Sequence, residues 1–225
     1  MKGLILKDLY GVRTTLLLSI ALMLFPSVAI AVTGGNIGDS EPGAMTELIA
    51  VIVYGMMNYM SVTLFSGFIM NTVSEDEATG WAKIQRVMPV SGGQIMGGKL
   101  IAMGLVVGIL TGLTLLFNIS GIIFYALPSE PMLAVPFVVA LMQVITLSLC
   151  LMLGYRVSTK IMTPMFLIIE VIIAAGAIFI VYLMISGKIP MTAVRIVIYA
   201  VIPVLAATAV AISYTLGKKA VMRDM

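Results

Sequence analysis

Histidine is absent from this sequence of 225 residues, and charged residues make up only 10% of it. Without histidine, neither a Ser-His-Asp triad nor a histidine-containing zinc site is possible. The sequence also has no glycine-rich loop of the Walker type that would hold a nucleotide. Its single cysteine, Cys150, excludes an intramolecular disulfide and lies within an apolar run. We therefore expect a chain that is not an enzyme, has no catalytic residues, and binds no metal or cofactor itself.

Apolar residues, by contrast, make up 61% of the chain, and its mean hydropathy is +1.16. They gather in runs of about 20 residues, the length that crosses a hydrocarbon core about 30 Å thick. Backbone groups in lipid must be paired within the segment, and the runs lack the two-residue alternation of a membrane barrel, so they are helices. The sequence predicts one all-α, polytopic membrane domain over residues 1–225, with six transmembrane helices at 14–33, 46–70, 100–127, 132–154, 161–186 and 196–216.

Several polar residues and prolines interrupt these runs. The third run contains Asn118, and it either crosses as one helix or ends early and continues as a re-entrant or interfacial piece. Asn118, Gln143 and Thr146 are expected to form hydrogen bonds between helices. Pro26, Pro136 and Pro203 are expected to kink the first, fourth and sixth spans.

The orientation follows from the basic residues, which stay on the cytoplasmic side of a membrane. With the N-terminus inside, eleven of the thirteen lysines and arginines are cytoplasmic, and the exceptions are Lys188 and Arg195. This predicts a multi-pass protein of the cell membrane with both termini in the cytoplasm. The net charge of +3 is then explained by the basic residues that orient the chain in the membrane. Nucleic acid is therefore not expected as a partner.

The N-terminal segment allows two interpretations. Lys2 and Lys7 precede an apolar run that ends in the small-x-small pattern of residues 29–31, as a secretory signal peptide would. Asp8 argues against a signal peptide, and Leu4, Ile5, Leu9 and Val12 share one face of a helix. We therefore expect an interfacial helix over residues 1–13, followed by a retained first span.

The loop at residues 71–99, between the second and third spans, has its own structural signals. Ser74 with Glu77 forms a capping box, which predicts the start of a helix. Trp81, Ile84 and Met88 recur on one side of this helix, and Asp76, Thr79, Lys83 and Arg86 recur on the other. Pro89 ends the helix, and a second capping box, Ser91 with Gln94, opens the next one. By itself this pattern fits either a helix anchored at the lipid headgroups or a docking site for another protein.

A family resemblance favours docking. Residues 75–81 (EDEATGW), the Met88-Pro89-Val90-Ser91 run, Ile95 and Lys99 resemble, after an opening Leu6-Lys7-Asp8, the small permeases of ATP-binding-cassette type-2 exporters. Some of those permeases export antimicrobial or cytolytic peptides. One departure is Gly92, which stands where the family often has a basic residue.

The resemblance implies a type-2 permease fold in which the loop is a coupling helix gripped by a separate cytoplasmic ATPase. That partner would bind ATP and Mg²⁺, and a second permease chain, identical or different, would complete the transporter within the lipid bilayer. Export of an amphipathic peptide, antibiotic or lipid is the implied activity. The implied ATPase-coupling residues are Glu75, Asp76, Glu77, Trp81, Lys83, Arg86, Pro89 and Ser91.

Polar residues within spans are the candidates for a substrate path, because they are costly in lipid. Glu170 lies well inside the fifth span, and it serves either as a structural hydrogen-bonding group or in translocation. Tyr54, Asn58, Ser61 and Phe65 share one face of the second span, which is either a packing face or a lining for amphipathic cargo. Gly104, Gly108 and Gly112 follow one side of the third span, where we expect another helix of the chain, or a second subunit, to approach closely.

Two functions of other classes remain open at this point. One is a membrane-embedded immunity or scaffold protein that binds a partner and never couples to ATP. The other is an ion-coupled secondary carrier, which would require inverted repeats and paired charges at the membrane midplane. Copurification of an ATP-hydrolysing subunit distinguishes the exporter from both.

Overall fold

The computed structural model describes residues 2–11, 13–14, 17–18, 21, 59, 72–73, 75–76, 78–81, 84, 89–125, 129–155, 157, 161, 164–173, 175 and 190–221. The regular structure of this described part is helical, as the sequence predicts. Three stretches are long and apolar enough to cross a membrane: Gly92–Ile123, Met132–Gly154 and Val197–Val221. They correspond to the predicted third, fourth and sixth spans. Most of the predicted first, second and fifth spans lies outside the described residues.

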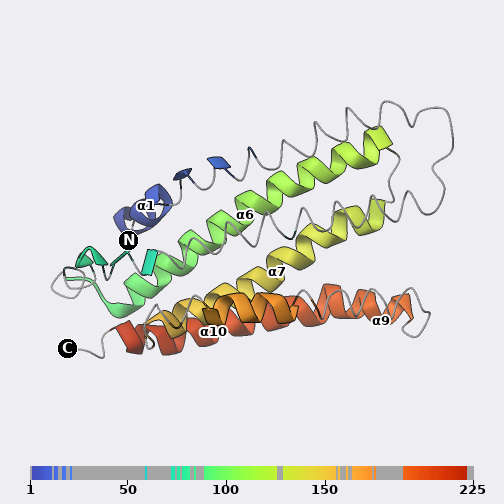
Figure 1. Cartoon of the computed structure of the whole chain (residues 1–225). Helices are drawn as coiled ribbons and strands as arrows, with labels where there is room; N and C mark the ends of the chain where they lie inside the picture. Colours follow the sequence, from blue (N-terminus) through green and yellow to red (C-terminus); the bar gives the residue numbers. More distant parts are fainter. Residues whose placement is uncertain are drawn as a thin grey trace.

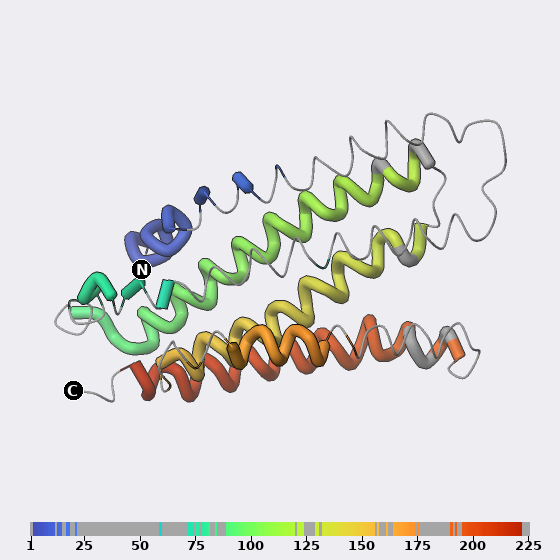
Figure 2. The backbone as a smooth tube through the Cα atoms, viewed as in Figure 1, coloured from blue at the N-terminus to red at the C-terminus, as the bar shows by residue number. Residues whose placement is uncertain are grey.

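The three long helices form one bundle. Helix α6 (Gly92–Tyr125) runs away from the end of the molecule where α1 (Lys2–Gly11) lies, and α7 (Ser129–Gly154) returns toward that end (Figure 1). Helix α10 (Ile202–Val221) runs in the same direction as α7 and packs against both α7 and α6 (Figure 2). Helix α1 packs against α6. The opposite directions of α6 and α7 are those of two consecutive membrane crossings.

The helix bounds differ from the predicted spans most clearly at the third span. Helix α6 begins at Gly92, eight residues before the predicted start of the span at residue 100, and runs to Tyr125 without a break at Asn118. The buried Asn118 amide is paired within the bundle, since its Nδ2 donates to the Met132 carbonyl oxygen of α7 over 2.6 Å. The alternative of an early end is therefore wrong, and the predicted interhelical bond is confirmed. Thr146 differs from that prediction, since its hydroxyl donates to Met142 of its own helix.

The core lies where α6, α7 and the helical segment Pro164–Ile173 meet. Its buried apolar side chains include Met103, Leu110, Leu147 and Phe166, and Cys150 is buried among them. At the α1 end, α6 and α10 come especially close: a Cβ added to Gly217 would lie 2.8 Å from Met96 Cε. A side chain at residue 217 would therefore have to displace the end of the Met96 side chain, which is fully buried.

A π-helical turn precedes α10. It spans Val197–Val201, continues from α9 (Met191–Ile196), and ends with the Ile202 N–H donating to the Val197 carbonyl oxygen. Pro203 has no N–H and would break a regular α-helical ladder, so the wider turn accommodates this proline just inside the helix.

The glycine face of α6 points outward. A Cβ added to Gly104, Gly108 or Gly112 meets nothing within 4 Å, and all three residues are exposed. The expected packing of this face against another helix of the chain is therefore wrong for the described part of the structure. Exposed apolar side chains, including Leu105 and Ile109, lie beside these glycines, as expected of a surface in contact with lipid or another subunit.

Candidate functional site

The second capping box forms as predicted and fixes the start of α6. The Ser91 N–H donates to Gln94 Oε1 over 2.9 Å, and the Gln94 N–H donates to Ser91 Oγ over 3.2 Å. These reciprocal bonds pair two of the N–H groups that a helix start leaves open. Because the helix starts here, Lys99 stands two turns inside α6 and on its buried side.

The loop before α6 contains two helical pieces instead of the single predicted helix. Thr79 closes the first piece, with its N–H and its hydroxyl both donating to the Glu75 carbonyl oxygen. Gly80 follows with a φ of 72°, a left-handed conformation that ends helices and favours glycine. The second piece begins there, since the Ile84 N–H donates to the Gly80 carbonyl oxygen. The prediction of one continuous amphipathic helix is therefore wrong at Gly80.

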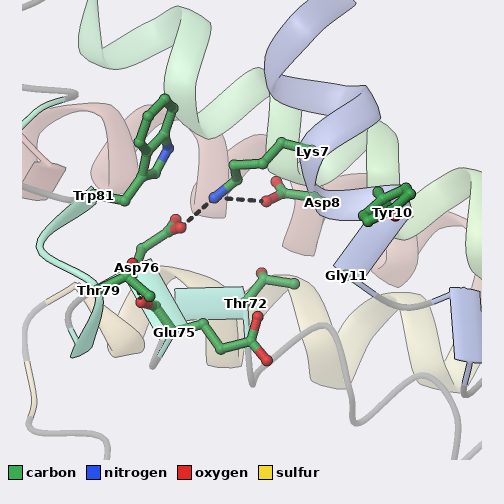
Figure 3. Close-up of a pocket in the computed structure, with 9 residues that line it drawn as sticks. All are labelled: Lys7, Asp8, Tyr10, Gly11, Thr72, Glu75, Asp76, Thr79 and Trp81. Carbon is green, nitrogen blue, oxygen red and sulfur yellow. Dashed lines mark hydrogen bonds and ion pairs between the residues drawn. The ribbon is translucent and has the colours of Figure 1, made fainter.

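Four charged residues meet between α1, the first loop piece and α6, and we call them the four-charge cluster: Lys7, Asp8, Asp76 and Lys99. Figure 3 shows the first three of them. Lys7 pairs with Asp76 and lies 3.2 Å from Asp8. Lys99 Nζ lies 2.9 Å from Asp76 Oδ2 and 3.4 Å from Asp8 Oδ1, and it donates to Thr72 Oγ1 over 3.1 Å. The cluster thus joins three segments that are far apart in sequence.

Burial makes this cluster structurally important. The side chains of Lys99, Asp76 and Asp8 are 2%, 5% and 6% exposed, whereas Lys7 is 33% exposed. Two positive and two negative charges balance, and each buried charge has an opposite charge beside it. Desolvated charges are tolerated only when they are paired in this way, so the three segments are held in one relative arrangement.

Trp81 lies beside the four-charge cluster. Lys7 Nζ lies 5.5 Å from the centre of its ring, within the range of a cation–π contact. A cavity of about 370 Å³ opens here, lined by Lys7, Asp8, Tyr10 and Gly11 from α1 and by Thr72, Glu75, Asp76, Thr79 and Trp81 from the loop (Figure 3). The buried Trp81 Nε1 has no hydrogen-bond partner among the described residues. The cavity therefore has a lining of charged, polar and aromatic side chains that come from two segments of the chain.

The predicted coupling residues differ in their exposure to solvent. Glu75, Pro89 and Ser91 are exposed, and Trp81 is partly buried at the cavity. Asp76 points inward to the two lysines, so its carboxylate is not on the outer surface. Ile84, predicted to lie on the apolar side with Trp81, is 46% exposed. Glu77, Lys83 and Arg86 lie outside the described residues.

Sequence reasoning did not identify Lys7, Asp8, Thr72 or Lys99 as site residues. Lys7 and Lys99 counted toward the orientation, and Asp8 counted against a signal peptide. A signal was nevertheless available, because Lys7, Asp8, Asp76 and Lys99 all fall within the motifs that carry the family resemblance.

A second polar group lies within the bundle, around Glu170. The Tyr59 hydroxyl lies 2.6 Å from Glu170 Oε2, and Gln143 Nε2 lies 3.1 Å from both carboxylate oxygens. Glu170 is 5% exposed. Gln143 therefore forms the interhelical bond predicted for it, from α7 to the segment Pro164–Ile173. Tyr54, Asn58, Ser61 and Phe65 lie outside the described residues, so the predicted substrate path stays a prediction.

Among the described residues, no group of three or more acidic, histidine or cysteine side chains is arranged to hold a metal ion.

Comparisons with known proteins agree with the resemblance seen in the sequence. A family model described as "ABC-2 family transporter protein" matches residues 3–220. No curated protein and no solved structure matches the chain.

Proposed function

The chain belongs to the ABC-2 family of transporter proteins and is a membrane permease subunit of an ABC transporter, and from this premise we propose that it couples ATP hydrolysis by a separate ATPase chain to the export of an amphipathic substrate. The ATPase would bind ATP and Mg²⁺, and a second permease chain would complete the transporter. The observation that carries this proposal is the four-charge cluster, because it connects the loop to a spanning helix.

The ion pairs of the four-charge cluster link the loop to α6. Lys99 holds Asp76 of the loop and Asp8 of α1 while standing on α6 itself. Helix α6 has 34 residues, and at 1.5 Å per residue it is about 50 Å long. A force applied to the loop would therefore move α1 and the cytoplasmic half of α6 together, as a rigid body.

The proposed contact surface for the ATPase consists of the residues that the cluster leaves exposed. Glu75, Pro89 and Ser91 are exposed on the described part of the loop, and Trp81 borders the cavity. Glu77, Lys83 and Arg86 belong to this proposed surface through the family resemblance. We assign Asp76 a positioning role, since its carboxylate holds the loop and is not free to meet a partner.

The proposed cycle follows from this geometry. Two ATPase chains close around ATP and shift the loops of the two permeases, and the spans respond by opening outward. The distribution of basic residues supports a cytoplasmic position for the loop and both termini, since eleven of the thirteen would then lie on the cytoplasmic side. Substrate would pass along the predicted faces of the second and fifth spans, where Tyr54, Asn58, Ser61, Phe65 and Glu170 lie.

Copurification tests the proposal. The chain is tagged at its C-terminus in the source organism, solubilised gently and assayed for ATP hydrolysis. We expect an ATPase subunit to copurify with the wild type and with Trp81→Ala and Pro89→Leu, but these two variants should lose the link between hydrolysis and export.

The alternatives make different predictions in the same experiment. An immunity or scaffold protein, or an ion-coupled carrier, would yield no ATP-hydrolysing subunit. Substrate-stimulated hydrolysis and export at wild-type levels in both variants would remove the loop from the coupling mechanism.

A further inference from the structure

Glu170 is the one charged residue in the interior of a predicted span, since Glu47 stands at the very start of the second span. The depth of Glu170 in the membrane follows from the position of its hydrogen-bond partner Gln143. Gln143 is the middle residue of the membrane-crossing stretch Met132–Gly154, with eleven residues on either side. Its Nε2 touches both Glu170 oxygens, so the carboxyl group lies close to the midplane of the membrane.

The neighbours of this carboxyl group are neutral. Tyr59 comes from the predicted second span and Gln143 from α7, and among the described residues no basic side chain forms an ion pair with Glu170. Among the described residues, Cys150 of α7 also interacts electrostatically with Glu170. A charge at this depth without a counter-charge is unfavourable, and binding a cation would remove the penalty.

The geometry around Tyr59 fits two protonation states of Glu170 without moving any heavy atom. The Tyr59 hydroxyl lies 2.6 Å from Oε2 and 2.9 Å from the Glu170 backbone carbonyl oxygen, and it has one hydrogen. With Glu170 ionised, that hydrogen is donated to Oε2, and 2.6 Å is a typical distance for a charge-assisted O–H···O bond. With Glu170 protonated, Oε2 donates to the Tyr59 oxygen, and the Tyr59 hydrogen turns to the backbone carbonyl.

From these contacts we infer that Glu170, Tyr59 and Gln143 form a proton-binding site at the membrane midplane. The carboxylate takes a proton from hydronium, releasing water, and becomes a neutral carboxylic acid bonded to Tyr59. A proton is the cation that fits, because Glu170 is 5% exposed and the described residues offer no further acidic ligands for a metal ion. Separation of these helices would admit water and release the proton, which links proton binding to the rearrangement of the bundle.

Infrared spectroscopy of the purified chain in lipid bilayers tests this site directly, and it requires neither the ATPase nor a substrate. Spectra are recorded while the pH is stepped from acidic to alkaline, and the C=O stretch of protonated carboxyl groups is followed. We expect Glu170→Gln to lose one such band, equivalent to one proton per chain. Glu130→Gln is the matched control, since Glu130 is exposed at the far end of the bundle and should leave the band in place.

Tyr59→Phe provides an independent variant in case Glu170→Gln does not fold. It removes the hydroxyl partner and should shift the frequency of the band attributed to Glu170. The inference is overturned if Glu170→Gln keeps every protonated carboxyl band of the wild type, or if Tyr59→Phe leaves the spectrum unchanged.

Discussion

Two groups of ion pairs, at opposite ends of the helix bundle, show how differently the same chemistry is used. At the α1 end, the four-charge cluster is mostly buried and joins three segments. At the other end, Arg195 of α9 donates two hydrogen bonds of 2.8 Å to Glu130 in the first turn of α7, and the two side chains are 52% and 48% exposed (Figure 1). The exposed pair has the better bond geometry, but water can replace either partner.

The consequence of losing one partner separates the two groups. In the four-charge cluster, removing one charge leaves its partners desolvated and unpaired, which is strongly unfavourable. At the exposed pair, the remaining charge is hydrated again. Because the four-charge cluster is buried, its ion pairs hold the loop in position. The following variants measure how much more stability is lost at the cluster than at the exposed pair.

The largest effect is expected for Lys99→Met. Asp8 and Asp76 would then share Lys7 alone, and we expect a loss of about 3 to 5 kcal/mol in the stability of this arrangement. Thermal unfolding in detergent and proteolysis of the loop measure the loss, and Lys218→Met, on the exposed side of α10, is the control.

Charge balance provides a sharper version of this experiment. The double variant Lys99→Met with Asp8→Asn keeps the neutral pair of Lys7 and Asp76, so it should be more stable than Lys99→Met alone. Additive destabilisation by the two substitutions would contradict the role assigned to the cluster.

A smaller effect is expected where α6 and α10 touch beside the cluster. Gly217→Ala would place a methyl group 2.8 Å from the buried Met96 side chain, and such overpacking costs about 1 to 3 kcal/mol. Gly104→Ala is the matched variant on the exposed face of α6, where a methyl group meets nothing within 4 Å. Unfolding midpoints should fall for Gly217→Ala only, and equal midpoints would show that the close contact is absent.

Gly80→Ala tests the break in the loop. A Cβ at a φ of 72° is disfavoured by about 1 to 2 kcal/mol, so the loop should become more sensitive to proteases. Gly80→Asn should be milder, because asparagine tolerates the left-handed conformation better. Protection equal to the wild type in Gly80→Ala would indicate a continuous helix, as the sequence pattern alone predicts.

The smallest effect is expected at the exposed pair. A hydrogen bond from Arg195 to Glu130, together with the nearby charge, raises the pKa of Arg195, but this group is already protonated at physiological pH. It therefore contributes no change of stability with pH in that range. Glu130→Gln should leave the unfolding midpoint unchanged, and a drop comparable to that of Lys99→Met would remove the distinction between the two regions.

The sequence predicted what depends on local pattern. The fourth predicted span and α7 both end at Gly154, and the Ser91–Gln94 capping box forms, because hydropathy and helix capping act over a few residues. The four-charge cluster could not be predicted in this way. Asp8 and Lys99 are 91 positions apart, and their pairing depends on α1 lying across the start of α6.

The break at Gly80 was missed for another reason. The spacing of Trp81 and Ile84 fits a helix whether or not it continues upstream, and periodicity does not report the sign of φ at a glycine. The outward direction of Gly104 could not be predicted from the sequence either. Small residues in a span predict close contact with a helix, but they do not indicate whether that helix belongs to the same chain.

The central claim is that the loop held by the four-charge cluster is the surface that an ATPase grips. A photoreactive residue at Glu75, with a second at Glu130 as control, measures this directly in membranes of the source organism. We expect a covalent adduct between the Glu75 position and an ATP-hydrolysing chain, and none at Glu130. Adducts to lipid alone at the Glu75 position, in membranes that contain the ATPase, would contradict it.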